Sequence, residues 1–479
     1  MRYHLRTDTP QFFSDISEVV RLFEPTAEIS PDGGDAVLLH RHEELQGGAI
    51  WRETWRIDGG EPLFHEAEAA HGGLLEKRLL KRAVKTGLFR LFARDRSEMP
   101  PWGSLTGIRP TRLVYEMLEE GLSLDEAVSR ISELFFVSEH KARLLGEIVS
   151  VQKGLIERED DEFDVYIGIP FCTTRCTYCS FSSGEIGDGR LVEPYLQALE
   201  REIRASAQIT KDMGLRVRAC YMGGGTPTSL SAEQLARVLD CAMECFPNAR
   251  EWTVEAGRPD TIARDKLKAL RERGIGRISV NPQTFSDETL ARIGRAHTAR
   301  DTLAAFALAR EEGFSNINMD LIAALPGEDE NAFLFSLEKA LSLAPESITV
   351  HTLAIKRSSR LHEKKYAQSD ATEAARMVDE ARKRLTEAHY LPYYLYRQKY
   401  MAGNLENVGY SKEGCACLYN IDIMEETAPI LALGAGAITK WLFPRELRIE
   451  RAPNVKNIEE YIVRVDEMVE RKRALLAKK

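Results

Sequence analysis

The sequence predicts an α/β fold in which six βα units form a partial (β/α)6 TIM-like barrel. An α+β N-terminal domain precedes the barrel and a C-terminal extension follows it. Two observations lead to this prediction. Short apolar, β-prone runs recur six times between residues 165 and 353, and amphipathic helical patterns such as Ala232–Cys245 and Glu330–Ser342 separate them. Alternating strands and helices favour a parallel sheet that curls or closes, with the carboxyl end of every strand on one rim.

Changes of pattern along the chain predict three regions. They are an N-terminal α+β and helical domain, 1–158, the barrel core, 159–370, and a C-terminal region, 371–479. In the first, the patterns predict a helix at about 11–23, a strand at 49–57, and a helical region over 64–158 with helices near 113–119 and 124–152. In the third, they predict a helix over 372–389 before the tyrosine-rich segment 390–400.

The composition is that of a soluble globular protein. The chain has 479 residues, 43% of them hydrophobic and 29% charged, and a net charge of −9, so its average surface does not favour nucleic acid. One basic run, 77–96, admits a nucleic-acid role, although a helix with a solvated basic face is the more common explanation. The N-terminus lacks the apolar core of a secretory signal, and no window has membrane-spanning length. We therefore expect a cytoplasmic protein with no membrane partner and no nucleic-acid partner.

The predicted strand ends deliver polar residues or glycines to one rim. The stretch "IPFC" follows the first strand and "GGGTP" follows the second. The later strands contribute, in order, Glu255, Gln283, Asp320 and the segment 351–354. A scattered arrangement would be expected if these residues had no common function, so the rim is the predicted site.

Three cysteines follow the first predicted strand within "GIPFCTTRCTYCSF", residues 168–181. Cys172, Cys176 and Cys179 form a C-x3-C-x2-C array in a chain that has only eight cysteines. A tetrahedral zinc site would need a remote fourth ligand, because the next cysteine is Cys220 and no histidine lies between His140 and His297. A [4Fe–4S] cluster normally takes four thiolates, so three would leave one iron open for a ligand that reacts.

Several longer stretches carry a family resemblance. They are "YIGIPFCTTRCTYCSF", "YMGGGTPTSL", "VNPQTFSDETLARIGRAHT", "NMDLIAALPGE" and "ALGAGAIT". The cysteine array after the first strand of a βα barrel resembles the radical S-adenosylmethionine (SAM) superfamily. The longer stretches resemble the oxygen-independent coproporphyrinogen III oxidases, or dehydrogenases, of the HemN group. With "PWGSLTGIRPT" in the N-terminal region, the chain is most similar to the HemZ-like branch.

The resemblance implies two cofactors and their ligands. A [4Fe–4S] cluster would be bound by Cys172, Cys176 and Cys179, and SAM would chelate its open iron. The family's SAM contacts fall on Tyr166, Tyr178, Gly224, Gly225, Thr226, Glu255, Gln283, Arg295, Asp320, Ala354 and Ile438. Glycines allow a backbone to approach a ligand closely, and an arginine can pair with the SAM carboxylate.

The reaction implied is the oxidative decarboxylation of two propionates of coproporphyrinogen III, which gives protoporphyrinogen IX in haem biosynthesis. A deoxyadenosyl radical formed from SAM would remove a β-hydrogen, and loss of CO₂ and one electron would leave each vinyl group. The partners implied are this tetrapyrrole and an electron donor or acceptor protein. Two alternatives remain open: a haem chaperone that keeps the cluster, and a radical SAM enzyme that acts on another tetrapyrrole.

The chain departs from the family pattern at two positions. Gly168 stands where the family's "HIPFC" has histidine, and Phe181 stands where the HemN pattern has a further cysteine. Neither change removes a cluster ligand, but both weaken the transfer of substrate contacts.

Other residues have two interpretations each. Lys356, Arg357, Arg397 and Lys399 are candidate partners for substrate carboxylates or solvated charges. The tyrosines of 390–400 would line the site or pack a C-terminal core. Cys415 and Cys417 would be an auxiliary metal or redox pair, or ordinary thiols. Cys220, Cys241 and Cys245 are expected to be thiols of the core or of helices.

Overall fold

The computed structural model describes residues 1–107, 109–181, 183–356, 358–364, 366, 370–398, 401–443 and 448–478. The chain divides into two compact units, 1–146 with 403–405, and 147–402 with 406–479. The sequence-based boundaries at 158 and 370 stay predictions. In the described part of the chain, no helix combines the length and the apolar character that crossing a membrane requires.

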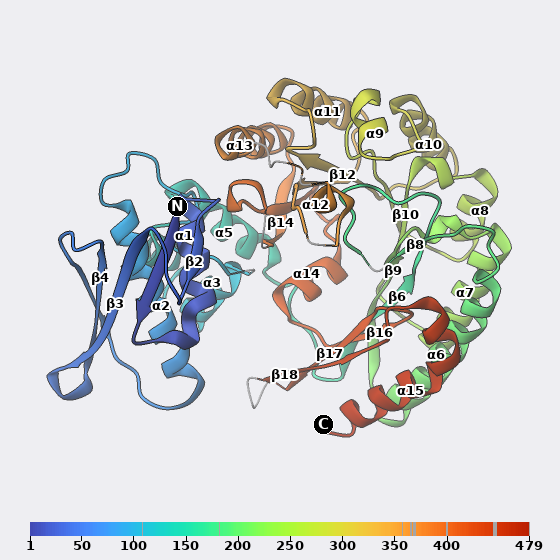
Figure 1. Cartoon of the computed structure of the whole chain (residues 1–479). Coiled ribbons are helices and arrows are strands. Elements are labelled where there is room, and N and C mark those ends of the chain that lie inside the picture. The colour runs from blue at the N-terminus through green and yellow to red at the C-terminus, as the bar shows by residue number, and fades with distance from the viewer. Residues whose placement is uncertain are drawn as a thin grey trace. The chain divides into compact units, whose positions relative to one another are not determined.

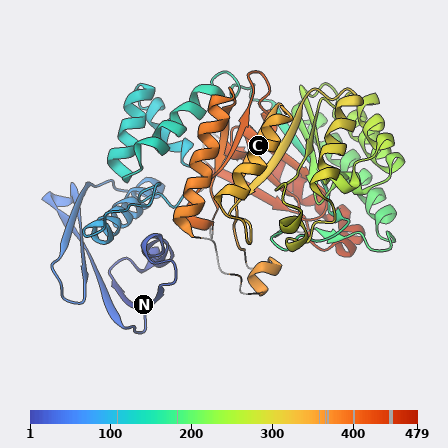
Figure 2. The ribbon, with the colours of Figure 1, turned by 90° about the horizontal axis from the view of Figure 1, so that it is seen from above.

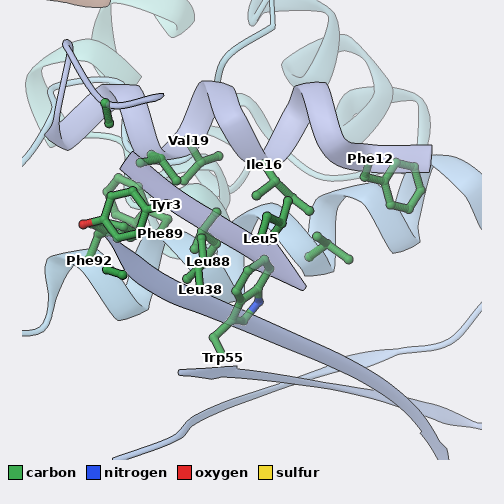
Figure 3. Packing of buried hydrophobic residues seen from close by; sticks show 14 residues of the cluster. Tyr3, Leu5, Phe12, Ile16, Val19, Leu38, Trp55, Leu88, Phe89 and Phe92 are labelled. Carbon is green, nitrogen blue, oxygen red and sulfur yellow. The ribbon is translucent and has the colours of Figure 1, made fainter. Parts of the chain in front are cut away.

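The N-terminal unit is built on a five-stranded sheet with the order β2-β1-β3-β4-β5. Its strands are β1 (Arg2–Thr7), β2 (Glu28–Ser30), β3 (Ala36–Leu45), β4 (Ile50–Ile57) and β5 (Leu63–Glu68). Its helices are α1 (Phe13–Phe23), α2 (Gly73–Ala93), α3 (Thr111–Glu119) and α4 (Leu124–Phe135), followed by α5 (Glu139–Gln152). Ile16 and Val19 of α1 and Phe89 of α2 pack with Leu38 and Trp55 of the sheet in one buried cluster (Figure 3).

Two predictions for this region were wrong. Residues 63–68 form the strand β5 instead of the start of a helical region. The helix predicted at 124–152 is two helices, because Phe136 adopts a left-handed conformation with φ 58° and ends α4. Ser138 then accepts a hydrogen bond from the backbone of Ala142 and begins α5.

The basic run 77–96 lies mostly on α2, and many of its cations have acidic or carbonyl partners in the same unit. Arg78 pairs with Glu116 at 2.9 Å, and Arg96 donates to the carbonyl oxygen of Phe23 at 3.0 Å. These contacts account for part of the basic run within the unit, although exposed ion pairs of this kind add little stability.

The second unit contains an eleven-stranded sheet with the order β14-β15-β13-β12-β11-β10-β9-β6-β16-β17-β18. Its predicted parallel strands are β6 (Glu162–Ile169), β9 (Arg216–Gly224), β10 (Glu251–Gly257), β11 (Arg277–Val280), β12 (Ile317–Ala323) and β13 (Ser347–Thr352). The predicted partial barrel is confirmed, since these six strands curve together with helices on their outer face (Figures 1 and 2).

Helices connect the parallel strands and cover the outside of the sheet (Figure 1). They are α6 (Val192–Asp212), α7 (Ala232–Cys245), α8 (Arg264–Glu272), α9 (Asp287–Arg292), α10 (Ala299–Glu311), α11 (Glu330–Ser342) and α13 (Ala371–Glu387), with the short α12 (Arg360–Glu363). A capping box begins helix α7: the Ser231 side chain accepts a hydrogen bond from the Gln234 backbone, and the Gln234 side chain accepts one from the Ser231 backbone. The helix therefore begins where the sequence predicts.

The C-terminal region extends this sheet on both sides. Strand β16 (Ile430–Leu433) is a seventh parallel strand, which pairs with β6 so that Leu433 lies opposite Ile167. Strands β17 (Ile438–Phe443) and β18 (Arg448–Pro453) follow it antiparallel, while β15 (Asn407–Ser411) and β14 (Leu391–Tyr396) add to β13. Among the described strands the sheet stays open, with β14 and β18 at its edges.

A buried polar network fixes the loop after β16 beside the rim. Glu202 of α6 accepts hydrogen bonds from the backbone of Gly434 at 2.7 Å, from Tyr461 at 2.6 Å and from Lys472 at 2.6 Å. Tyr461 and Lys472 belong to α15 (Ile458–Leu476). Because the carboxylate and the ammonium are both almost completely buried, their pairing holds α15 and this loop in one geometry.

Candidate functional site

The carboxyl ends of the parallel strands surround a cavity of about 350 Å³. Twelve of the predicted site residues line it: Cys172, Cys176, Tyr178, Cys179, Gly224, Gly225, Thr226, Glu255, Gln283, Arg295, Asp320 and Ala354. The strand ends that the sequence placed on one rim therefore converge on one site.

Two predicted residues lie elsewhere. Tyr166 lies in a stack with Tyr221, which lines the cavity, and with Tyr419, at centroid distances of 6.4 and 6.2 Å. Ile438 begins β17 and is 48% exposed, outside the lining of the cavity. The structure does not bring it to the other residues, and its contact with SAM stays a prediction.

The cysteine loop starts in the short strand β7 (Phe171–Cys172), which pairs with β8 (Gly184–Glu185). The Cys179 amide donates to the carbonyl oxygen of Cys176 at 3.2 Å, and the Thr226 hydroxyl lies 3.6 Å from the Cys172 sulfur. Burial raises the pKa of the Cys172 and Cys179 thiols. In the part of the chain described, no three metal-ligating side chains converge on a single ion. A cluster does not require such convergence, because each thiolate binds a different iron.

The glycines after β9 form a cradle against this loop. A Cβ atom on Gly225 would lie 2.6 Å from the carbonyl oxygen of Phe171 and 3.0 Å from the Cys172 sulfur. Gly224 has φ +112°, a conformation that side chains rarely adopt. With glycine at these two positions, the backbone can approach a ligand more closely than it could with any other residue type.

Arg295 lines the cavity, and one of its hydrogen-bond donors has no partner among the described residues. Its Nη2 donates to the Tyr178 hydroxyl at 3.0 Å and its Nη1 to the carbonyl oxygen of Asn281 at 3.4 Å. Its Nε is buried and has no hydrogen-bond partner among the described residues. Such a donor fits a ligand carboxylate, which the guanidinium would bind by a charge-assisted hydrogen bond.

Two carboxylates occupy different environments in the cavity. Burial raises the pKa of Glu255 to about 7, although the hydrogen bond from Tyr221 opposes this shift. Burial alone would also raise the pKa of Asp320, but hydrogen bonding and the charge of His351, together with a hydrogen bond from Asn318, lower it. Asp320 is thus a stable acceptor for hydroxyl groups, while Glu255 changes charge near neutral pH.

Gln283 reaches the rim in a strained conformation. Its φ is 69°, in the left-handed region, and its backbone makes a bridge to β12 through Asp320 and Ile322. Strain of this kind is often found at binding sites.

Comparisons with known proteins agree with this geometry. The sequence model of the radical SAM superfamily matches residues 166–340. The oxygen-independent coproporphyrinogen-III oxidase-like protein HemZ of Bacillus subtilis (strain 168) is 42% identical over 380 residues, which cover 78% of this chain and 76% of that protein. The chain belongs to the HemZ-like family of radical SAM proteins.

Other relatives of this chain carry the names of different functions. The heme chaperone HemW of Bacillus subtilis (strain 168) is 40% identical over 193 residues, which cover 40% of this chain and 50% of that protein. The solved structure of coproporphyrinogen III oxidase (HemN) from Escherichia coli, a radical SAM enzyme, matches with a TM-score of 0.53 and 24% identity, covering 69% of this chain and 73% of that one. The structural match supports the fold.

Membership in the superfamily implies a [4Fe–4S] cluster and SAM as the cofactors. The residues present fit both groups. Three thiols lie on one loop, the glycine cradle leaves room for a ligand beside Cys172, and the Nε of Arg295 has an unused hydrogen.

Several residues that line the cavity of this chain are not predicted from the sequence. They are Tyr221, Arg258, Asn281 and Asn318. His351 was assigned to the rim only as a strand end, and its Nε2 lies 3.7 Å from Asp320. Tyr221, Arg258, Asn281 and His351 lie towards or just after the carboxyl ends of their strands, which is the one signal the sequence offers. Asn318 lies at the start of β12, so no such signal marks it.

The residues with two interpretations divide between the alternatives. Lys356, Tyr394 and Tyr396 line the cavity, whereas Tyr393 packs in a buried cluster with Cys417. Arg397 is only 2% exposed, and burial lowers its pKa to about 10. Arg357 and Lys399 lie outside the described residues.

The remaining cysteines have different environments. Cys417 donates from its sulfur to Glu251 at 3.1 Å, and burial raises its pKa. Cys415 is half-buried, and its carbonyl oxygen accepts a hydrogen bond from Arg277. Cys220 and Cys241 are buried, and Cys245 is partly buried on α7.

Proposed function

We propose that this protein is a radical SAM oxidoreductase that decarboxylates coproporphyrinogen III to protoporphyrinogen IX without oxygen. One observation carries the proposal: a single cavity joins the three cysteine thiols to Arg295, Glu255 and Asp320. The similarity to the HemZ protein, over three quarters of its length, supports the choice of substrate.

The residues of the chain have separate tasks in this proposal. Cys172, Cys176 and Cys179 hold the cluster, and Arg295 and Asp320 orient SAM through its carboxylate and its hydroxyl groups. When bound, the two cofactors supply the one-electron chemistry that removes a hydrogen atom from carbon. Tyr394 and Tyr396 would help to exclude water from the cavity.

The substrate carries four propionates, so the cavity needs cations near its mouth. Lys356 and Arg175 are two of the cations that line the cavity, and we propose them as partners for propionates. Each reacting propionate loses a β-hydrogen atom, CO₂ and one electron to become a vinyl group. An electron-acceptor protein would take that electron.

Anaerobic reconstitution tests the proposal. Protein with iron, sulfide, SAM, a reductant and coproporphyrinogen III should release CO₂ and form protoporphyrinogen IX, as detected by mass spectrometry. Lys356→Ala should raise the KM for the tetrapyrrole about 10- to 100-fold, since one charged contact is worth about 1.5–3 kcal/mol. SAM cleavage without substrate should stay unchanged. An intact cluster that cleaves SAM but never decarboxylates this substrate would refute the proposal.

A second candidate function is haem delivery. The 40% identity to the heme chaperone HemW over 193 residues favours it. The same reconstituted protein would then bind haem tightly and transfer it to an acceptor protein, with no decarboxylation of coproporphyrinogen III. A tight haem complex with no porphyrinogen turnover would favour this alternative.

A further inference from the structure

Arg258 brings a buried positive charge to the cysteine loop. It follows β10, and its side chain is only 4% exposed. Its Nη1 lies 3.8 Å from the sulfur of Cys176 and donates to the carbonyl oxygen of Thr174 at 2.9 Å. We propose that Arg258 raises the reduction potential of the cluster that Cys176 helps to bind, and that Asp260 limits this effect.

Asp260 fixes the orientation of this guanidinium. Its two carboxylate oxygens accept hydrogen bonds from Nε and Nη2 of Arg258 at 3.0 and 3.2 Å. The same carboxylate accepts from the hydroxyl of Thr173 at 2.9 Å, beside the cluster ligand Cys172. His297 is also buried, with its Nδ1 3.6 Å from Oδ1 of Asp260. Asp260 therefore links Arg258 to the cysteine loop through Thr173, and Arg258 itself contacts the loop through Thr174.

The direction of the effect follows from charge. A thiolate-bound cluster becomes more negative when it is reduced, so a nearby positive charge stabilises the reduced form. Hydrogen bonds to the sulfurs, net charge and solvent exposure set the potentials of iron–sulfur clusters. Because Arg258 is buried, water screens its charge only weakly. Arg258 acts through Cys176 and is a positioning residue. This inference requires the cluster but is independent of the tetrapyrrole.

Two substitutions with opposite charge effects test the inference. Arg258→Gln removes a positive charge, and Asp260→Asn removes the negative charge that faces it. Each full-length variant is reconstituted without oxygen, its iron and sulfide are quantified, and its midpoint potential is measured by redox titration followed by electron paramagnetic resonance. No SAM and no substrate are added. We expect a more negative midpoint for Arg258→Gln and a more positive midpoint for Asp260→Asn.

Matched variants separate a tuning role from a structural one. Arg264→Gln removes another paired arginine, whose hydrogen bonds go to Glu311 and Glu312, and should leave the midpoint unchanged. Arg258→Lys keeps the positive charge but loses the paired hydrogen bonds of the guanidinium to Asp260. Its midpoint potential should fall between those of the wild type and Arg258→Gln.

An unchanged midpoint potential in Arg258→Gln with full iron content would overturn the inference. A shift of the midpoint in the same direction in Arg258→Gln and Asp260→Asn would also overturn it. If Arg258→Gln binds no iron, Asp260→Asn and Arg258→Lys decide the question. A midpoint of Asp260→Asn at or below that of the wild type then refutes the role.

Discussion

The phenol of Tyr221 donates a hydrogen bond of 2.5 Å to Oε1 of Glu255 in the wall of the cavity. This contact joins the adjacent strands β9 and β10. Glu255 also lines the cavity, and burial raises the pKa of its carboxyl to about 7. A pKa near 7 lets Glu255 change charge near neutral pH, and the hydrogen bond from Tyr221 is the largest of the contacts that favour its ionised form.

SAM binding should depend on pH through this carboxyl. The pKa of Glu255 is raised, so the side chain is largely neutral below about pH 7 and charged above it. If it binds the cationic end of SAM, affinity should rise as pH increases from about 6 to about 8. Glu255→Gln should weaken binding about tenfold above pH 7 and flatten the profile, as measured by anaerobic calorimetry. Tyr221→Phe is the partner variant and should move the inflection to higher pH. An unchanged profile in Glu255→Gln would exclude this role.

Iron content should depend on three cysteines and not on the others. Cys176→Ala should abolish both the cluster and SAM cleavage, because its sulfur is a predicted ligand. Cys415→Ala is the control, since Cys415 is half-buried and outside the cavity lining. It should retain full iron and sulfide by chemical analysis. Iron lost equally from both variants would show that the ligand set is wrong.

A methyl group at Gly225 should disrupt the site. Its Cβ would lie 2.6 Å from the carbonyl oxygen of Phe171, so the backbone of the cysteine loop must shift. Gly225→Ala should destabilise the protein by about 1–3 kcal/mol and reduce cluster occupancy and SAM affinity. Gly276→Ala is the matched control, because no atom lies within 4 Å of its added Cβ. Wild-type cluster content and SAM affinity in Gly225→Ala would contradict the cradle.

Glu53 should stabilise the N-terminal unit more than a surface carboxylate does. Glu53 is fully buried and accepts hydrogen bonds from His40 and His42 at 2.8 and 2.9 Å. Glu53→Gln should cost about 1–3 kcal/mol, because the amide can accept from one histidine only and leaves a buried donor without an acceptor. Glu66→Gln breaks the exposed pair with Arg52 on the neighbouring strand and should cost at most about 1 kcal/mol. Hydrogen exchange of β3 and β4 in the full-length protein would measure both. Equal effects would refute this difference.

The group formed by Glu53, His40 and His42 also predicts how the stability of the N-terminal unit varies with pH. Hydrogen bonding to Glu53 raises the pKa of His42, so its contribution is present below about pH 6.5 and is lost as pH rises through the raised value. Burial would raise the pKa of Glu53, but the two histidines lower it, so its contribution disappears as pH falls. Protection of β3 and β4 should therefore be greatest in mildly acidic solution. His42→Gln should remove the loss on the alkaline side, and a persistent loss would assign it to another group.

Much of the barrel was predictable because its signals are local. Apolar runs marked each of the six strands, and α7 and α11 have the predicted bounds. The break at Phe136 was missed, because the helical pattern continues through a residue that adopts a left-handed conformation. Strand β16 was missed because its parallel character depends on pairing with β6, which lies far away in the sequence.

Some features of the site were also predictable from the sequence and others were not. The cysteine array, the glycines and the acidic strand ends follow from motif and position, and the structure gathers them in one cavity. The contact of Arg258 with Cys176 could not be predicted, since it depends on where the side chain of one loop meets another loop. The location of Ile438 outside the cavity depends on the course of the chain after β16.

The pairing of β16 with β6 has a consequence for biogenesis. Until residues 430–433 leave the ribosome, one edge of β6 has no neighbour, although the cysteine loop follows β6 directly. Long-range strand pairing is slow, and unpaired edges are prone to aggregate. The cluster should therefore be inserted after translation is complete. A cell that synthesises this protein faster than it assembles the cluster would accumulate iron-free, aggregation-prone chains.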